Sequence, residues 1–337
     1  MKAAVYLGAG EIEIQEIPEP DLGPNDVMVK PKYVGICGSD LSAYEYGMYE
    51  RGLVMGHEFS GEVVDVGEAV TQWKKGDRVV PNSLTPCKIC SFCTDRRYSL
   101  CEDMQMVGIS MNGGLAELVA LPETTLHALP DSVDFQIGAL VEPLSIALRG
   151  FNMIRFNPGN SVLVLGTGPI GIMSIHLARL MEASVVYASE PLSARRSAAK
   201  HAGADAVFDP TDESVALRIE NLTQGLGVDS VVECTGEPGP TSEAFQLVKR
   251  GGKILVLGIS EEPVEVDFMT GVLNELTVQF SYLGYEEFPE AIRLLEEGAI
   301  NPRQMITSII PLRRIVEDGF EALAHPESAE VKVLVEI

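Results

Sequence analysis

Basic residues are scarce in this chain of 337 residues. Lysine and arginine together number 25, against 49 aspartates and glutamates, which gives a formal net charge of -24. Such a surface repels phosphate backbones and anionic membranes. We therefore expect neither nucleic acid nor a membrane as a partner, and we interpret the acidity mainly as an aid to solubility.

Segments for export or membrane insertion are also missing from the expected pattern. Residues 1–20 hold no basic segment followed by an apolar run and a small-residue cleavage site, so we expect a cytoplasmic protein. Residues 162–181 are apolar enough to imitate a membrane span, but glycines, a proline, a histidine and an arginine interrupt them. A buried strand, a turn and a helix explain this stretch better.

Length and composition predict a globular protein of two domains. Hydrophobic residues make up 46% of the chain and charged residues 22%, which is ordinary for a folded protein. The chain is longer than the size at which one hydrophobic core usually stops growing. Two domains are therefore the expectation.

Only six cysteines occur, and four of them lie in the stretch PCKICSFCTDRRYSLC at 86–101. Their spacing, C-x2-C-x2-C-x7-C, lets four thiolates surround one tetrahedral zinc ion and leaves no position for a substrate. An iron-sulfur site of the bacterial type needs a different fourth spacing followed by proline, and a redox pair needs one C-x-x-C beside a strand-to-helix turn. We predict a structural zinc site, with a reduced loop without metal as the alternative; its ligands are Cys87, Cys90, Cys93 and Cys101.

A dinucleotide-binding turn follows the strand-like run NSVLVLG. The glycines have the spacing G-x-G-x-x-G at Gly166, Gly168 and Gly171, with Ile170 in the same turn, and a helix-period run comes next. Glycines at these positions permit a tight turn, close approach of the backbone to a pyrophosphate, and close packing of the helix. The strand, turn and helix together predict a nicotinamide dinucleotide site.

The acid that follows the next strand indicates which dinucleotide binds. Glu190 ends the run SVVYAS, nineteen residues past Gly171, where a carboxylate can accept hydrogen bonds from the adenosine ribose. A 2'-phosphate would meet that carboxylate repulsively, so NAD is predicted. Arg195 and Arg196 lie close enough in sequence to soften this preference, and Arg195 is included among the predicted cofactor contacts.

Alternating strands and helices define the second half of the chain. Four more short apolar runs follow the first two, at 204–208, 228–236, 252–260 and 276–283, with helical stretches between them. This pattern predicts a six-stranded doubly wound parallel sheet, a Rossmann fold, over 146–286. Residues 1–145, rich in glycine, proline and long loops, predict a mainly β domain, which 287–337 complete through the terminal run AEVKVLVEI.

Two further cysteines stand outside the loop. Cys234 ends an apolar run and is interpreted as a core residue. Cys37 lies in a glycine-flanked turn, YVGICGSDLSAY, and His57 and Glu58 follow twenty residues later in MGHEFSGEVVDVG. Taken alone, the tripeptide Gly-His-Glu at 56–58 is a weak signal for a metal site, because a lone histidine is more often a structural residue than a ligand.

With these residues in view, the chain resembles the zinc-dependent medium-chain dehydrogenases, the superfamily of alcohol dehydrogenase, over essentially its full length. The motifs that carry the resemblance are GICGSDLSAYEYG, MGHEFSGEVVDVGEAVTQWKKGDRVV, the four-cysteine loop, LVEPLSIAL and GTGPIG, in that order. Within the superfamily, the chain looks most similar to the polyol, 2,3-butanediol and threonine dehydrogenase branch, because the later zinc-site residue is a glutamate, Glu142 in VEPLS. The resemblance implies a GroES-like catalytic domain beside the Rossmann domain.

The resemblance also implies a second, catalytic zinc ion held by Cys37, His57 and a glutamate. Either Glu58 or Glu142 could be that glutamate, and both are assigned to the site without deciding which binds directly. An open fourth position would take the substrate oxygen, so that the alcohol loses its proton more readily and hydride passes to the nicotinamide. An exchange between carboxylate and substrate is a hypothesis for this site.

Further roles follow from the same resemblance. Asp40 is expected to fix the tautomer of the zinc-bound histidine, and Ser39 to take the proton of the alcohol. The histidine that the family often has five residues after the zinc cysteine is Ser42 here, which leaves the proton route open. On their own, Ser39 and Asp40 also fit simple turn formation.

Substrate contacts are predicted from the same regions. Tyr44, Tyr46 and Tyr49 follow the zinc cysteine where the substrate mouth is expected, although ordinary packing explains any one of them equally well. Sorbitol dehydrogenases have an arginine after the phenylalanine of the last strand of the sheet, whereas this chain has Ser281 after Phe280. A long polyol is therefore a less certain substrate.

The predicted function is transfer of hydride between NAD and a secondary alcohol, a vicinal diol or a polyol, with two zinc ions per chain. The alternatives are a dehydrogenase of threonine or of a phosphorylated alcohol, and a binding protein that has lost turnover. The family also leads us to expect a homo-oligomer, either a dimer or a tetramer.

Overall fold

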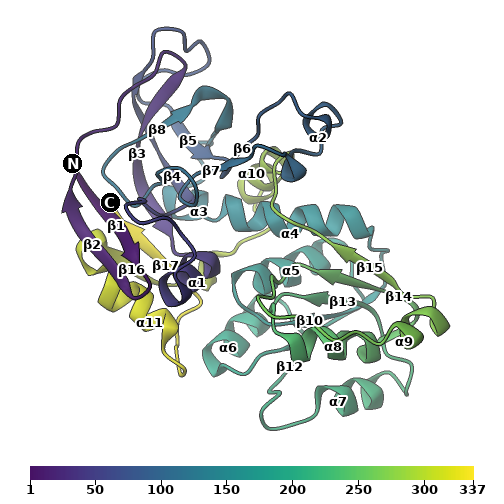
Figure 1. The fold of residues 1–337 in the computed structure, drawn as a ribbon. Coiled ribbons are helices and arrows are strands. Elements are labelled where there is room, and N and C mark those ends of the chain that lie inside the picture. Colours follow the sequence, from purple (N-terminus) through teal and green to yellow (C-terminus); the bar gives the residue numbers. More distant parts are fainter. The chain divides into compact units, whose positions relative to one another are not determined.

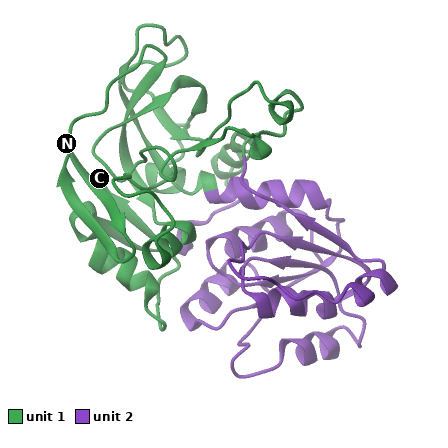
Figure 2. Cartoon of the chain, viewed as in Figure 1, with its two compact units in different colours: residues 1–142, 285–298, 306–337 green, residues 143–284, 299–305 purple.

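Two units, each with its own sheet, make up the fold in the computed structural model, which describes residues 1–337. Unit 1 comprises Met1–Glu142, Tyr285–Gly298 and Ile306–Ile337, and unit 2 comprises Pro143–Gly284 and Ala299–Met305 (Figure 2). The predicted domain boundaries fall after residues 145 and 286. In the structure the two units meet after residues 142 and 284, and residues 299–305 also belong to unit 2.

Unit 2 contains the predicted six-stranded parallel sheet, in the order β12-β11-β10-β13-β14-β15 (Figure 1). The central strand, SVLVL at Ser161–Leu165, is apolar and buried over nearly its whole length, as expected when helices cover a parallel sheet on each side. Because β10 pairs with both β11 and β13, the strand order reverses there, as in doubly wound folds. The strands are β10 (Ser161–Leu165), β11 (Val185–Ser189), β12 (Ala206–Phe208), β13 (Val228–Glu233), β14 (Val248–Val256) and β15 (Thr277–Phe280).

Helices of unit 2 connect these strands and pack on the sheet. The core between them includes Leu163, Phe208, Val231, Phe245 and Ile254. The helices are α5 (Pro169–Leu180), α6 (Ser193–His201), α7 (Val215–Leu222), α8 (Pro238–Leu247) and α9 (Phe268–Leu273), with a 3-10 turn at Arg303–Met305. Helix α4 (Val141–Ile154) begins in unit 1 and continues into unit 2.

Unit 1 is mainly β. Its seven-stranded sheet has the order β16-β17-β3-β4-β5-β9, and β8 also pairs with β3. Two smaller antiparallel pairs, β1-β2 and β6-β7, complete it. The strands are β1 (Lys2–Gly8), β2 (Glu11–Glu16), β3 (Asp26–Gly35), β4 (Glu58–Val66), β5 (Arg78–Pro81), β6 (Leu84–Thr85), β7 (Gln105–Met106), β8 (Val119–Pro122), β9 (Leu126–Ala128), β16 (Ile306–Pro311) and β17 (Lys332–Glu336).

The helices of unit 1 are short and lie between these strands. They are α1 (Gly38–Tyr46), α2 (Ser91–Thr94), α3 (Phe135–Gly138), α10 (Phe288–Glu296) and α11 (Glu321–Ala324), with 3-10 turns at Tyr98–Leu100, Glu123–Thr125 and Leu312–Arg314 and a π-helical turn at Ile315–Phe320. The end of the chain returns to the sheet as the sequence predicts, because β17 pairs with β3 and places Leu334 opposite Gly35. Strand β16, which pairs with β17, was not predicted. None of the helices has the length and apolarity that a membrane crossing requires.

Candidate functional site

Two neighbouring strands of unit 1 bring the first predicted metal ligands together. Strands β3 and β4 pair antiparallel with Gly35 opposite Glu58, so the residues just after β3 and just before β4 meet at one end of the pair. Cys37 caps helix α1 there, and His57 directly precedes β4. Ligand atoms of Cys37, His57 and Glu58 all lie within 4.8 Å of one another. A side chain at position 35 would overlap the Glu58 carboxylate, which explains the glycine.

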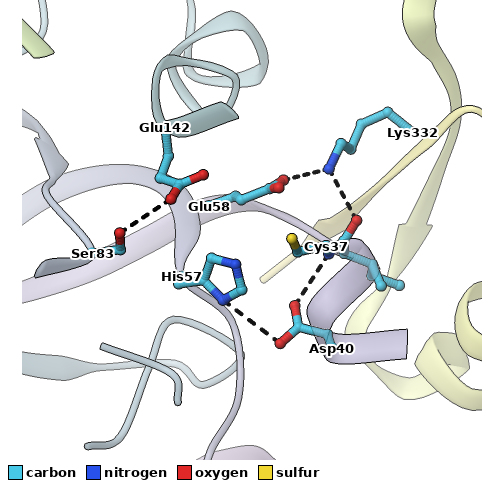
Figure 3. A network of polar contacts seen from close by, with 8 residues as sticks. Cys37, Asp40, His57, Glu58, Ser83, Glu142 and Lys332 are labelled. Atoms are coloured by element: carbon cyan, nitrogen blue, oxygen red, sulfur yellow. Dashed lines mark hydrogen bonds and ion pairs between the residues drawn. The ribbon is translucent and has the colours of Figure 1, made fainter. Parts of the chain in front are cut away.

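Asp40 lies where it can orient His57. Its Oδ2 accepts a hydrogen bond from the backbone N–H of Cys37 at 3.1 Å, and its Oδ1 lies 3.6 Å from Nδ1 of His57 (Figure 3). Nε2 of His57 is then the nitrogen left for a metal. Burial raises the pKa of Asp40; burial also opposes the charged form of His57, but Asp40 and Cys37 together keep the pKa of His57 well above its usual value.

Glu142 lies on the first turn of α4 and is also buried. The hydroxyl of Ser83 donates a hydrogen bond to its Oε1 at 3.1 Å (Figure 3). Burial, with a smaller contribution from Glu58, raises the pKa of Glu142 to about 7. Glu142 does not belong to the group of ligand atoms within 4.8 Å of one another, whereas Glu58 does.

Lys332 is a site residue that the sequence analysis missed. It begins β17, is buried to 1% exposure, and its ammonium contacts Oε2 of Glu58 at 2.5 Å and the carbonyl oxygen of Ile36 at 3.0 Å (Figure 3). A lysine inside the apolar run VKVLV was the available signal, because a buried ammonium needs a partner. Ser83 carried no comparable signal.

The charges around these residues indicate a cation site. Three buried carboxylates, those of Asp40, Glu58 and Glu142, share two buried basic groups, the ammonium of Lys332 and the imidazole of His57. Buried negative charge in excess of its partners is costly unless a cation compensates it. Sulfur, imidazole nitrogen and carboxylate oxygen are also the donors that zinc prefers. Cys37, His57 and Glu58 therefore could hold a zinc ion, with Glu142 beside them.

The second predicted metal site is equally compact. The four sulfurs of the cysteine loop lie within 4.8 Å of one another, and no disulfide joins them. Backbone N–H groups point at the sulfurs: Cys87 donates to Sγ of Cys101 at 3.2 Å, and Cys90 donates to Sγ of Cys87 at 3.4 Å. A backbone N–H of Glu102, the largest contribution, helps to lower the pKa of Cys90 to about 6. These thiols could hold a structural zinc ion.

The glycine turn of unit 2 leaves room for a ligand at one position only. An added Cβ at Gly171 would overlap the carbonyl oxygen of Gly166, and Gly166 itself has a φ of +81°, so both glycines are required by the turn. Gly168 has an ordinary φ of -64°, and an added Cβ would meet nothing closer than Nη1 of Arg195 at 4.0 Å. The space beside Gly168 fits the pyrophosphate of a dinucleotide. Ile170 follows in the first turn of α5.

Glu190 is fixed beside this turn. Its Oε2 accepts the backbone N–H of Thr167 at 2.8 Å, and its Oε1 accepts that of Leu192 at 3.0 Å. Carboxylate oxygens retain further acceptor capacity for ribose hydroxyls. Arg196 is engaged by Asp209 at 2.8 Å and by the carbonyl oxygen of Glu190, and the backbone of Arg195 accepts a hydrogen bond from Thr167.

The residues predicted to carry the proton or to contact the substrate have environments that do not by themselves indicate a role. Ser39 is half-buried at the start of α1. The ring of Tyr44 packs on Phe320 with 5.1 Å between centroids, whereas Tyr46 is 67% exposed. Ser281 follows β15 in unit 2, and its hydroxyl is buried without a hydrogen-bond partner. Their roles in substrate binding and proton transfer stay predictions.

Two family models match the chain. Residues 23–131 match the alcohol dehydrogenase GroES-like domain, and residues 169–297 match the zinc-binding dehydrogenase domain. These matches lie in the mainly β unit and chiefly in the Rossmann unit, respectively.

Known proteins resemble the chain over its whole length. Sorbitol dehydrogenase of Bacillus subtilis is 30% identical over 99% of this chain and 97% of its own. The crystal structure of 2R,3R-butanediol dehydrogenase from Bacillus subtilis is 34% identical, has a TM-score of 0.91, and is matched over 100% of this chain and 99% of that chain. A zinc-binding dehydrogenase structure from Sinorhizobium meliloti 1021 bound to NADP is 32% identical, with a TM-score of 0.92 and coverage of 100% and 99%. The chain thus belongs to the zinc-type medium-chain dehydrogenases of the alcohol dehydrogenase superfamily.

Proposed function

We propose that the protein is a zinc-dependent dehydrogenase that transfers hydride between NAD and a secondary alcohol, a vicinal diol or a polyol. The observation that carries this proposal is the buried group of Cys37, His57 and Glu58, whose ligand atoms lie within 4.8 Å of one another. The names of the sorbitol and butanediol dehydrogenases among its relatives support the class of substrate.

Each side chain of the site has a distinct task in this proposal. Cys37, His57 and Glu58 or Glu142 would hold the zinc ion. When bound, zinc acts as a Lewis acid on the substrate oxygen. Asp40 holds the His57 ring with Nδ1 turned toward itself. Ser39, half-buried at the start of α1, is the proposed carrier of the alcohol proton.

NAD is the proposed dinucleotide, bound at Gly166, Gly168, Ile170, Gly171, Glu190 and Arg195. Two backbone N–H groups hold the carboxylate of Glu190 in place, and a fixed anion there disfavours a 2'-phosphate. The test is the ratio of kcat/KM with NAD to kcat/KM with NADP. We expect NAD to be preferred, and Glu190→Ser to reduce the preference by at least about tenfold. A wild-type preference for NADP would refute the assignment.

Two zinc ions per chain are proposed, one in each cysteine-containing site. Metal analysis of the purified protein should give two ions, and His57→Ala should retain one and lose activity while its circular dichroism spectrum stays that of the wild type. Because thiols serve as ligands only when they are reduced, we also propose a cytoplasmic location. A wild-type protein with one ion would contradict the catalytic site.

The substrate class is tested by NADH formation over a panel of secondary alcohols, vicinal diols, polyols, threonine and sugar phosphates. Turnover confined to diols or polyols supports the proposal. Turnover confined to threonine or to phosphorylated alcohols selects the alternative dehydrogenases. No turnover with NAD or NADP across the panel, in a protein that holds two zinc ions, would favour a binding protein of the same fold.

We further propose a homo-oligomer built on unit 2. Helix α9 exposes Phe268 at 79% and Leu273 at 72%, and Phe280 of β15, the edge strand of the sheet, is 68% exposed. An apolar helix beside an unpaired strand edge fits a second copy of the same surface across a two-fold axis. Light scattering should report a dimer or tetramer, and Leu273→Glu should dissociate it. A wild-type monomer would refute the proposal.

A further inference from the structure

Lys332 is a buried cation that the family motifs do not include. It is 1% exposed, and its ammonium has two oxygen contacts, Oε2 of Glu58 and the carbonyl of Ile36. It comes from β17, at the end of the chain, whereas Glu58 opens β4. Burying an ammonium is costly unless its partners compensate for the water it loses. The carboxylate of Glu58 is the one charged partner in hydrogen-bond contact with this ammonium.

The two glutamates of the site have different partners. Glu58 contacts the ammonium of Lys332, whereas Glu142 accepts a hydrogen bond from the neutral hydroxyl of Ser83 (Figure 3). Glu58 is also the glutamate whose ligand atom lies within 4.8 Å of those of Cys37 and His57. Lys332 and a metal ion at this site would therefore share the carboxylate of Glu58.

We propose that Lys332 is a positioning residue that competes with the zinc ion for Glu58: it holds the carboxylate in place before the metal binds and weakens retention of the metal afterwards. This inference rests on the proposed catalytic zinc site. It assigns to the last strand of the chain a direct influence on metal affinity.

The sign of the effect follows from charge. Without the ammonium, the buried carboxylate of Glu58 loses its positively charged partner beside the carboxylates of Asp40 and Glu142, which raises the free energy of the metal-free protein. In the metal-bound protein, zinc supplies positive charge beside these carboxylates. Removing the ammonium of Lys332 therefore destabilises the metal-bound form less than the metal-free form. Removal of Lys332 therefore tightens zinc binding. A lysine with a merely structural role would destabilise both forms equally and leave zinc affinity unchanged.

The experiment measures zinc affinity in the full-length protein by competition with a chromophoric chelator. The step of the zinc titration that is absent in His57→Ala belongs to the site around Cys37. We expect Lys332→Met to bind zinc about tenfold more tightly at this site, and to lose more thermal stability in the metal-free form than in the metal-bound form. Lys332→Arg keeps the charge and should resemble the wild type.

Two controls separate this effect from a general loss of charge. Lys249→Met removes an ion pair with Asp229 in unit 2 and should leave zinc affinity unchanged. In a Glu58→Gln background, Lys332→Met should change zinc affinity by less than about threefold, because the shared carboxylate is gone. If Lys332→Met does not fold without metal, the double variant Glu58→Gln/Lys332→Met removes both charges and should fold.

The outcomes are distinct. Unchanged or weaker zinc binding by Lys332→Met would overturn the inference, as would a double variant that still does not fold. An equal effect of Lys332→Met in the wild-type and Glu58→Gln backgrounds would also overturn it. A wild-type protein that binds one zinc ion would instead overturn the proposed catalytic site, and the inference with it, so the two failures can be told apart by stoichiometry.

Discussion

Two glycines three residues apart should respond in opposite ways to the same substitution. Gly171 is required by the fold, because an added Cβ would lie well inside 3.0 Å of the carbonyl oxygen of Gly166. Gly168 has an ordinary φ of -64° and open space where its Cβ would be. Gly171→Ala should therefore destabilise the protein, whereas Gly168→Ala should spare the fold and weaken dinucleotide binding.

The magnitudes can be estimated from the two environments. Overpacking against a backbone oxygen costs about 1–3 kcal/mol, because the strand and helix must separate. For Gly168→Ala, a loss of about 0.5–1 kcal/mol at the helix N-cap, where glycine is preferred over alanine, roughly cancels the gain of about 0.4–1 kcal/mol from a less flexible unfolded chain. The difference of about 2 kcal/mol corresponds to roughly 4–8 °C in Tm for a domain of this size.

Two assays separate the effects. Thermal unfolding should give Gly168→Ala a Tm close to that of the wild type and Gly171→Ala a clearly lower one. Titration with NADH, followed by its fluorescence, should show a loss of affinity of about tenfold or more for Gly168→Ala, because the methyl group occupies the space for the pyrophosphate. Gly271→Ala, at an open position in α9, is the matched control for both assays.

Either of two results would refute this reasoning. Equal loss of stability in the two variants would mean that Gly168 is a structural glycine like Gly171. Wild-type affinity for NADH in Gly168→Ala would mean that the dinucleotide does not approach this turn, whatever its sequence pattern.

Three shorter predictions concern unit 1. Burial lowers the pKa of His127 to about 4, against 6.5 in the unfolded chain. The unfolded state therefore binds the proton first, and the free energy of unfolding falls by up to about 3 kcal/mol as the pH drops from 6.5 to 4. His127→Phe should reduce the difference in stability between pH 7 and pH 4.5 in urea unfolding, and an unchanged difference would contradict the prediction. Cys93→Ser should lower zinc content by one ion and reduce Tm, whereas full zinc content would exclude the four-thiolate site. Ser83→Ala should cost about 1–2 kcal/mol, because it removes a hydrogen bond to buried Glu142; chemical denaturation measures this loss, and stability equal to that of the wild type would argue against it.

Local patterns were sufficient for the features that depend on neighbouring residues. The four thiols of the cysteine loop lie within fifteen residues, and their spacing alone predicted the cluster in which they meet. The glycine turn and its flanking strand were equally evident, because β-branched runs and the positions of Gly166 and Gly171 follow directly from backbone geometry. The parallel sheet followed from the repeated alternation of strands and helices.

Contacts between distant parts of the chain were harder to predict. Ser83 and Glu142 are 59 residues apart, and Lys332 and Glu58 are 274 apart, so no periodicity links them. Strand β16 was missed because ITSIIP is short and ends in proline, and only its pairing with β17 defines it as a strand. The packing of the Tyr44 ring on Phe320, from a distant part of the chain, was likewise not predicted, and the substrate role of Tyr44 stays a prediction.

The sheet register explains why the distant residues matter to the site. Strand β3 pairs with β4 on one side and with β17 on the other, and Gly35 is opposite Glu58 in one pair and Leu334 in the other. The end of β3 is therefore the point where Cys37, Glu58 and Lys332 converge. A shift of β17 by one residue would turn Lys332 to the other face of the sheet and leave Glu58 without its ammonium. The terminal strand thus contributes a paired strand to the sheet and a positive charge to the candidate metal site through the same backbone pairing.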